Sequence, residues 1–265
     1  MSKPAIKEAS EVILEVGRIL LASGSTTNRV ETMMLKVANC FGYPKTHAFV
    51  TPTGIFLTVS DGKNEHRTNI YRIESRQMNL GKITAISRLI TEMEKAHCDV
   101  TDSKMSVTKL KAELYRVDHT QNWPTWLQIF AGGATSGFFC LLYGGSWLEF
   151  AVAYAVGVLV SLSVYLLGKL RLTLYLANTV GAMLIVLFTK LFQVWVPGYL
   201  NTDNIIIGGI MLLVPGLAMV NAIRDTMSGD LVSGMARGVE AIFIAVAIAT
   251  GTGVMFKIWT LLGGI

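Results

Sequence analysis

The apolar positions in the first 120 residues follow a helical period in four segments. Residues 4–22 carry apolar side chains three or four positions apart, and a second segment with this spacing ends near Gly42. Two later segments, about 80–97 and 104–119, repeat the pattern. Each of the four segments therefore predicts an amphipathic helix that turns one face toward a core.

The sequence "ASGSTTNRVE" separates the first two of these helices. Gly24 suits a helix end, because glycine readily adopts the left-handed conformation found there. Thr27 or Asn28 can cap the second helix, with Glu31 three residues after Asn28. Arg29 stands where an anion can bind at a helix start, although ordinary salt bridges and caps are the more common use of Arg29 and Glu31.

Between the helical segments the pattern changes to one typical of strands. "THAFVTPTGIFLTVSDG" is rich in β-branched and aromatic residues and ends in the turn signal Asp61-Gly62, and "RTNIYRIESR" can form the return strand. Pro52 cannot donate to a strand ladder, so a bend or bulge is expected around "TPTG", where Thr51 and Thr53 form a candidate polar site. Helices first and last around a small antiparallel sheet predict an α+β domain.

The second half of the chain is dominated by apolar segments long enough to cross a bilayer, which takes roughly 20 residues. Five spans are expected, at about 125–143, 147–168, 172–196, 204–223 and 238–260. The sequence "HTQNWPTW" marks the boundary, because its proline can start a helix and its tryptophans suit a membrane interface. The predicted fold class is a membrane protein, with an N-terminal α+β domain at residues 1–120 and a five-helix transmembrane domain at 121–265.

The distribution of charge supports this division. Of the whole chain, 52% is hydrophobic and only 15% is charged, against about 25% in a typical soluble domain. Residues 1–123 hold 17 of the 23 Lys and Arg and 13 of the 18 Asp and Glu. The net charge of +5 therefore reflects cytoplasmic loops more than nucleic-acid binding, and no nucleic-acid partner is expected.

The charges of the connecting loops predict an orientation, because Lys and Arg are retained on the cytoplasmic side. Lys169 and Arg171 follow the second span, and Arg224 and Arg237 follow the fourth. The loops "YGGSW" and "VPGYLNTDN" contain neither Lys nor Arg. The N-terminal domain is therefore expected in the cytoplasm and the C-terminus outside, with Glu149 as an external interfacial residue.

Residue types that carry enzymatic or metal chemistry do not form a recognisable pattern. The chain lacks a G-x-S-x-G nucleophile motif and a phosphate-binding glycine loop. The cysteines show neither a disulfide framework nor a metal-ligand spacing, and the histidines show no paired metal spacing: Cys40, Cys98, Cys140, His47, His66, His97 and His119. We expect no enzyme activity, no metal and no cofactor.

The stretch "VPGLAMVNAIRDTMSGDLVSGMARGVEAIF" combines an apolar setting with five ionisable residues: Arg224, Asp225, Asp230, Arg237 and Glu240. A charge within a bilayer costs about 2.5–3.5 kcal/mol on insertion scales. One arrangement that avoids this cost is a solvated cytoplasmic loop. The other is a span broken at Pro215-Gly216, followed by a short helix that lines a cavity, as in many transporters.

The second arrangement gives these residues roles in transport. Arg224 is the candidate contact for a substrate carboxylate, with Asn221 as a further candidate substrate ligand. Asn178, within the third span, needs a polar partner, and helix packing is the more common use of such a residue, with substrate contact as the alternative. Proton coupling needs a carboxylate whose pKa can change, for which the candidates are Asp225, Asp230 and Glu240.

Three motifs in this order resemble the threonine/serine exporter family of the ThrE type: "LLASGSTTNRVE", "FVTPTGIFLTVSDG" and "VPGLAMVNAIRDTMSGDLVSGMARGVEA". The resemblance extends over most of the chain and implies a bacterial inner-membrane exporter of small hydrophilic metabolites driven by the proton-motive force. Fused members of the family carry a second membrane domain, which this chain lacks. The chain is therefore similar to the larger subunit of a split form, which works with a second small membrane subunit.

The resemblance leaves the substrate open among threonine, serine and dicarboxylates such as succinate. It also implies a hetero-oligomer with several copies of each subunit. Two alternatives belong to other function classes. The chain could be a membrane-anchored hydrolase-like enzyme that uses the soluble domain, or a regulatory or scaffold subunit whose partner carries out transport.

Overall fold

The computed structural model describes residues 4–62, 65–74, 76–98, 107–120, 123–169, 173–196 and 198–263, without the side chains of 96–98. The chain divides into two compact units. The first contains Met1–Gln121 together with Met219–Gly238, and the second contains Asn122–Ala218 together with Val239–Ile265. The first unit therefore includes a late segment that the sequence pattern places with the membrane helices.

Four helices of the first unit occupy the segments with helical periodicity: α1 (Ile6–Ala22), α2 (Thr27–Cys40), α3 (Leu80–Cys98) and α4 (Val107–Asp118). Gly24 and Gly42 follow α1 and α2 with positive φ angles of 87° and 79°. Both helix ends therefore use the left-handed conformation that glycine adopts without a steric penalty. The expected start of the fourth helix, at 104–106, lies outside the described residues.

The sheet has three antiparallel strands in the order β1-β2-β3: β1 (Lys45–Thr51), β2 (Gly54–Ser60) and β3 (His66–Arg72). The expected bend at Pro52 is wrong, because the chain reverses completely there. Thr51 pairs with Gly54, which leaves Pro52 and Thr53 as a two-residue turn. A turn position suits Pro52 because proline fixes φ and, outside the ladder, loses no strand hydrogen bond.

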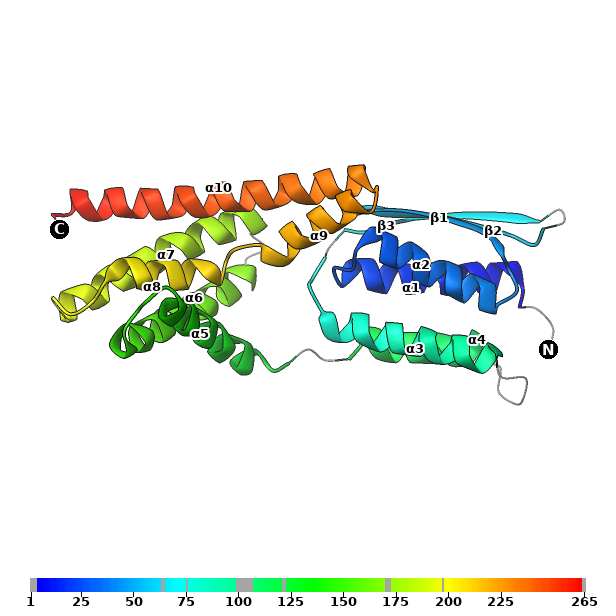
Figure 1. Ribbon diagram of the computed structural model, residues 1–265, viewed down its shortest axis with the longest axis horizontal. Helices are drawn as coiled ribbons and strands as arrows, with labels where there is room; N and C mark the ends of the chain where they lie inside the picture. The colour runs from blue at the N-terminus through cyan, green and yellow to red at the C-terminus, as the bar shows by residue number, and fades with distance from the viewer. Residues whose placement is uncertain are drawn as a thin grey trace. The chain divides into compact units, whose positions relative to one another are not determined.

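Three layers form the first unit, as Figure 1 shows: the sheet, then α1 with α2, then α3 with α4. Because α1 lies in the middle layer, it must be apolar on more than one side, and ten of its 17 residues are buried. Ile13 of α1, Leu57 of β2 and Ile86 of α3 are fully buried in one core.

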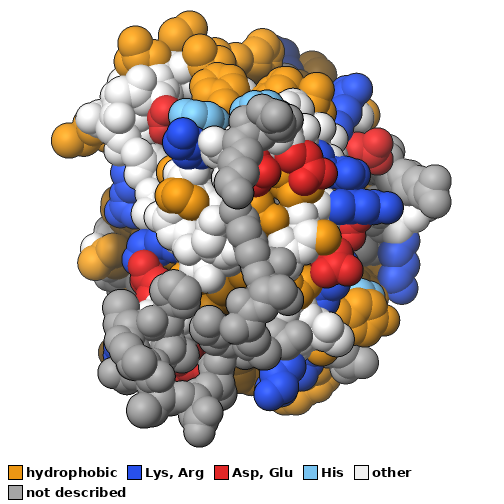
Figure 2. Space-filling view, turned by 90° about the vertical axis from the view of Figure 1, so that its right-hand side faces the viewer, with side chains coloured by type: hydrophobic (Ala, Val, Ile, Leu, Met, Phe, Trp, Pro, Cys, Tyr) orange, Lys and Arg blue, Asp and Glu red, His pale blue; other side chains and the backbone are white. Residues whose placement is uncertain are grey.

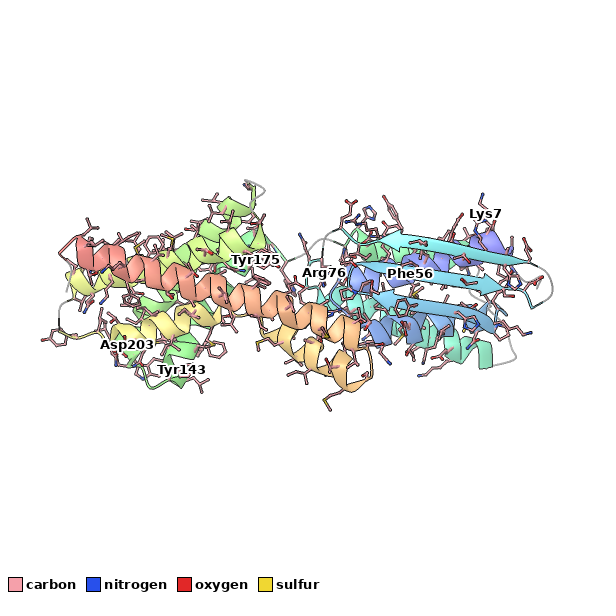
Figure 3. All side chains as sticks on the ribbon, turned by 90° about the horizontal axis from the view of Figure 1, so that it is seen from above. Lys7, Phe56, Arg76, Tyr143, Tyr175 and Asp203 are labelled. Atoms are coloured by element: carbon pink, nitrogen blue, oxygen red, sulfur yellow. The ribbon has the colours of Figure 1, made fainter. Side chains whose placement is uncertain are left out.

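The outer face of the sheet carries an exposed apolar row. Phe49, Phe56 and Ile70 pair across the three strands and are 57%, 43% and 68% exposed. Phe56 is labelled in Figure 3, and Figure 2 shows hydrophobic side chains along the upper edge of that view, above a mixture of charged groups. The inward residues of the same strands complete the core.

The second unit is built from long apolar helices. Three of them, α5 (Thr125–Leu142), α6 (Trp147–Lys169) and α7 (Leu174–Trp195), are each long and apolar enough to span a membrane. The helices α5 and α6 pack closely where Gly157 of α6 faces Gly132 and Gly133 of α5. A Cβ on Gly157 would lie 3.0 Å from the Gly132 oxygen and from the Gly133 Cα. This approach is possible because glycine has no side chain.

The fourth expected span is not a continuous helix. Its first part, α8 (Thr202–Met211), is followed after Pro215 by α9 (Gly216–Met227), with a bend of 54° between the two helices. The last helix, α10 (Leu231–Leu261), begins earlier than the expected 238. Within the described residues there are four candidate spans, or five if α8 and α9 form one broken span. The fold is mostly helical with a small sheet near the N-terminus, which is consistent with a membrane protein.

Candidate functional site

Met219–Gly238, which comprises most of α9 and the start of α10, forms a tight helical hairpin that we call the α9–α10 hairpin. Its turn contains Gly229 with φ of 91°, and the Asp230 N–H donates to the Asp225 carbonyl over 2.9 Å. A Cβ on Gly234 would lie 2.1 Å from the Thr226 Oγ1. The two helices can therefore approach this closely only because residue 234 is glycine.

A buried ion pair connects the two helices of the hairpin. The Arg237 Nε lies 3.1 Å from the Asp225 Oδ2, and the side chains are 4% and 0% exposed. Taking two charges out of water is unfavourable unless each remains paired. The ion pair therefore requires further polar partners, and the loop between α1 and α2 supplies them.

Three hydrogen bonds join the hairpin to this loop and to the start of α2. The Arg237 Nη2 donates to the Ser25 carbonyl over 2.7 Å, and the Asn221 Nδ2 donates to the Gly24 carbonyl over 3.2 Å. The Thr27 Oγ1 donates to the Asp230 Oδ2 over 3.1 Å.

These contacts place two carboxylates at the N-terminus of α2. The first N–H groups of a helix and its macrodipole favour negative charge at this end. The expected cap by Thr27 or Asn28 is wrong: Thr26 is the N-cap residue and makes no side-chain cap hydrogen bond. Thr27 is instead the first helical residue, and its hydroxyl binds Asp230.

Glu31 contacts the sheet and does not cap α2. Its Oε1 accepts the Val50 N–H over 2.7 Å. Burial raises the pKa of Glu31, the Val50 hydrogen bond partly opposes this, and the charge of Asp230 raises it further. Glu31 and Asp230 therefore influence each other although they come from distant parts of the sequence.

The remaining residues of the N-terminal motifs have structural contacts. The Arg29 Nη2 donates to the Ser87 Oγ of α3 over 2.8 Å. The Thr51 Oγ1 donates to the Gly54 carbonyl over 3.2 Å, within the β1–β2 turn, and Thr53 is exposed at that turn. The "TPTG" residues therefore shape a turn and do not join the cluster around the α2 N-terminus.

The other sequence-predicted site residues lie on α7, on α9, on α10 and at the break before α9. Arg224 is exposed on the last turn of α9, and Asn178 is buried on α7. Glu240 is half-buried on α10 and belongs to the second unit. Pro215 and Gly216 form the break before α9, where a Cβ on Gly216 would meet nothing within 4 Å.

Sequence reasoning missed two polar features. The Gly24 and Ser25 carbonyls bind the hairpin, and no residue-type signal identifies backbone acceptors. Glu149, expected as an external interfacial residue, is buried and accepts the N–H groups of Ser146 and Asn201 over 2.8 and 2.7 Å. The Ser146-to-Glu149 spacing is that of a capping box, which the sequence displays.

Metal chemistry gains no support from the geometry. Among the side chains that the structure describes, no three His, Cys, Asp or Glu residues come together as a metal site. The cluster therefore consists of one buried arginine, the carboxylates Asp225 and Asp230, and hydroxyl and backbone groups around the α2 N-terminus. Such a set can bind and release a carboxylate or a proton.

Comparison with known proteins gives a consistent result. The family model described as "Putative threonine/serine exporter" matches residues 11–259. Proteins named "Probable succinate transporter subunit YjjP" from Klebsiella aerogenes and Escherichia coli are each 22% identical over 97% of this chain, which covers 96% and 97% of their lengths. The "Threonine/serine exporter" of Corynebacterium glutamicum is 24% identical over 90% of this chain, which covers 48% of that protein. No solved structure matches the chain.

Proposed function

This chain belongs to the threonine/serine exporter family, and from that premise we propose that it is one subunit of a secondary exporter driven by the proton-motive force. Its substrates are small hydrophilic metabolites that carry a carboxylate. The names of the relatives point to threonine and serine on one side and succinate on the other. All three share the carboxylate that an arginine recognises.

The observation that carries this proposal is the buried Asp225–Arg237 pair at the α2 N-terminus. A proton on Asp225 removes the negative charge that lies 3.1 Å from the Arg237 Nε, and this makes the site more favourable for another anion. A substrate carboxylate can take that place, and its departure allows Asp225 to ionise again. Proton and substrate binding are linked in this way, because each changes the free energy of the other.

The other predicted residues have distinct places in this scheme. Asp230 stands next to the pair, bound by Thr27, and is positioned to share the coupling proton. Asn221 holds the loop through the Gly24 carbonyl. Coupling through Glu240 and substrate contact by Arg224 and Asn178 stay predictions; Arg224 has an exposed side chain and lies outside the buried cluster.

A second membrane subunit completes the proposed exporter. The chain covers nearly the whole length of the relatives named as subunits, but about half of the relatives named as exporters. A separate partner, present in several copies together with this chain, would supply the part of those exporters that this chain does not match. Purification of the tagged chain from its native genetic context should recover that partner, and unaided transport by the chain alone in vesicles would contradict the proposal.

The proposed location is a bacterial inner membrane, with the N-terminal unit in the cytoplasm and the C-terminus outside. The loop charges, including Lys169, support it. Cysteine substitutions at the exposed Glu65 and Tyr199 allow a test by labelling in intact cells. Labelling from outside is expected at residue 199 only, and the reverse result would invert the orientation.

Efflux from vesicles tests the function itself. The chain and its partner are reconstituted, loaded with threonine, serine or succinate, and assayed with and without a proton gradient. Asp225→Asn should abolish the stimulation by the gradient for the transported substrate. Asp203→Asn is the matched control, because Asp203 is an exposed carboxylate on α8.

Normal gradient-driven efflux by the Asp225→Asn variant would contradict the coupling role. It would favour a regulatory or scaffold subunit whose partner carries out transport. The amount of purified complex is compared between the Asp225→Asn variant and the unmodified protein. A normal amount shows that any loss of efflux does not come from a loss of assembly.

A further inference from the structure

The α9–α10 hairpin has two different sides. One side holds the buried pair and the contacts to the α1–α2 loop. The opposite side, which we call the outer face, consists of apolar side chains that are between 51% and 83% exposed: Val220, Ile223, Met227, Leu231, Val232 and Met235. Figure 3 shows the two short helical segments of this hairpin with their side chains.

We propose that this outer face is embedded in lipid, so that the hairpin lies in the interfacial layer of the bilayer while its inner side holds the N-terminal unit. The proposal concerns the membrane contact of the hairpin and is independent of transport. Six large apolar side chains on two adjoining helices would form an unusual patch for a surface in water.

The first argument is the continuity of this face with a membrane span. Along α10 the exposed apolar positions recur at alternating steps of three and four residues: Val232, Met235, Val239, Ile242 and Val246. This spacing places them on one side of the helix. The later members belong to a helix that is apolar and long enough to cross the membrane, so their exposed side chains are expected to meet lipid. No polar residue interrupts the row, so the same surroundings extend to Val232.

The second argument is the length of α10. Its 31 residues correspond to roughly 46 Å at about 1.5 Å per residue. A bilayer measures about 30 Å across its hydrocarbon core and about 40–45 Å with both interfacial regions. When most of α10 spans the core, its first turns therefore remain within the interfacial layer.

The charges of the hairpin agree with this position. Its two aspartates take part in the cluster on the inner side and are buried or half-buried. Arg224, on α9 beside Ile223, is exposed. An apolar helix face accompanied by a basic side chain is typical of helices that lie in a membrane interface, where the long stem of arginine lets the guanidinium reach lipid phosphates.

A spin-label experiment on the full chain, with its partner where this copurifies, tests the proposal. Native cysteines are replaced, and single cysteines are introduced at Ile223, Met235, Val246 and Thr53. The protein is placed in vesicles of phosphatidylcholine and phosphatidylglycerol. The access of oxygen, which concentrates in lipid, is compared with that of a water-soluble nickel complex. Thr53 is the aqueous reference and Val246 the lipid reference.

Labels at Ile223 and Met235 should be reached by oxygen to within about twofold of Val246 and should be protected from nickel relative to Thr53. Nickel access equal to that at Thr53 would overturn the proposal, because the face would then be in water. Low access of both reagents would also overturn it, because a partner subunit or a second copy would then cover the face. All four positions carry exposed side chains, so labelling should leave the fold intact; the elution profile of each variant checks this.

Discussion

Removing the negative charge of Asp225 should open the junction between the α9–α10 hairpin and the α2 N-terminus. In Asp225→Asn the Arg237 guanidinium, 4% exposed, loses the carboxylate at 3.1 Å and keeps its hydrogen bond to the Ser25 carbonyl. Breaking a buried ion pair by removing one partner typically costs about 3–5 kcal/mol. The hairpin therefore should remain folded against the loop for a much smaller fraction of the time.

Hydrogen–deuterium exchange followed by mass spectrometry of peptides is the suitable assay, since all five tryptophans lie outside the first unit and tryptophan fluorescence would report on the wrong part of the chain. If exchange follows local opening, a cost of about 3–5 kcal/mol accelerates exchange at the start of α2 by roughly 100- to 4,000-fold. Peptides from α5 and α6 should be unchanged. Asp203→Asn controls for the loss of an exposed carboxylate.

A double-mutant cycle decides whether the ion pair causes this effect. Asp225→Asn combined with Arg237→Met removes both charges, and replacing a buried pair by uncharged groups is often nearly neutral. The double variant should therefore exchange more slowly than Asp225→Asn alone, with a coupling energy of about 2 kcal/mol. Additive effects of the two substitutions, or wild-type exchange in Asp225→Asn, would refute the reasoning.

Three further predictions concern the first unit. Because burial raises the pKa of Glu31, ionised Glu31 destabilises the fold, so the contribution of Glu31 to stability is greatest at low pH and is lost as pH rises through the raised pKa. Glu31→Gln should remove this contribution to the pH dependence of thermal unfolding between about pH 4 and pH 7. Burial opposes ionisation of Asp118, but Arg18 and Lys82 hold its pKa below the ordinary value. The stabilisation by ionised Asp118 is therefore present at neutral pH and lost as pH falls. Asp118→Asn should lower the free energy of unfolding by about 1 kcal/mol at pH 7 and leave it unchanged in acid. Urea titrations at the two pH values measure this difference. Gly234→Ala should destabilise the hairpin by about 1–3 kcal/mol, because the added Cβ would overlap a side-chain oxygen. Gly238→Ala is the control: its Cβ would meet nothing within 4 Å, so it should be neutral or stabilising by up to about 1 kcal/mol. Equal hydrogen-exchange rates at α9 in these two variants would contradict the close-packing argument.

Local chemistry in the sequence determined the elements and the broad class of this protein. Helical spacing of apolar residues predicted α1 to α4, and Gly24 and Gly42 predicted where two of them end. Apolar length predicted the membrane helices, and the three motifs identified the family before any geometry was known. These features depend on residues that are neighbours in the chain, which is why the sequence reveals them directly.

Pro52 and Glu31 show where local rules stop. Proline is compatible with a bulge and with a turn, so the sequence alone could not distinguish the two. The pairing of Thr51 with Gly54 shows that the chain reverses at Pro52. Glu31 has the spacing of a capping residue, but the Val50 N–H of a neighbouring strand competes for its carboxylate. In both cases the result depends on a partner that packing brings near.

The candidate site shows the same limit over a longer distance. The sequence identified Asp225, Asp230 and Arg237 as unusual charges in an apolar setting, but a charge pattern cannot state which groups neutralise them. The partners are Thr27 and the Ser25 carbonyl, which lie 203 and 212 positions earlier in the chain than Asp230 and Arg237. Only the tertiary structure brings these groups together. The free-energy cost of burying a charge is offset by the polar groups within hydrogen-bond distance, and the fold selects these groups without regard to their separation in sequence.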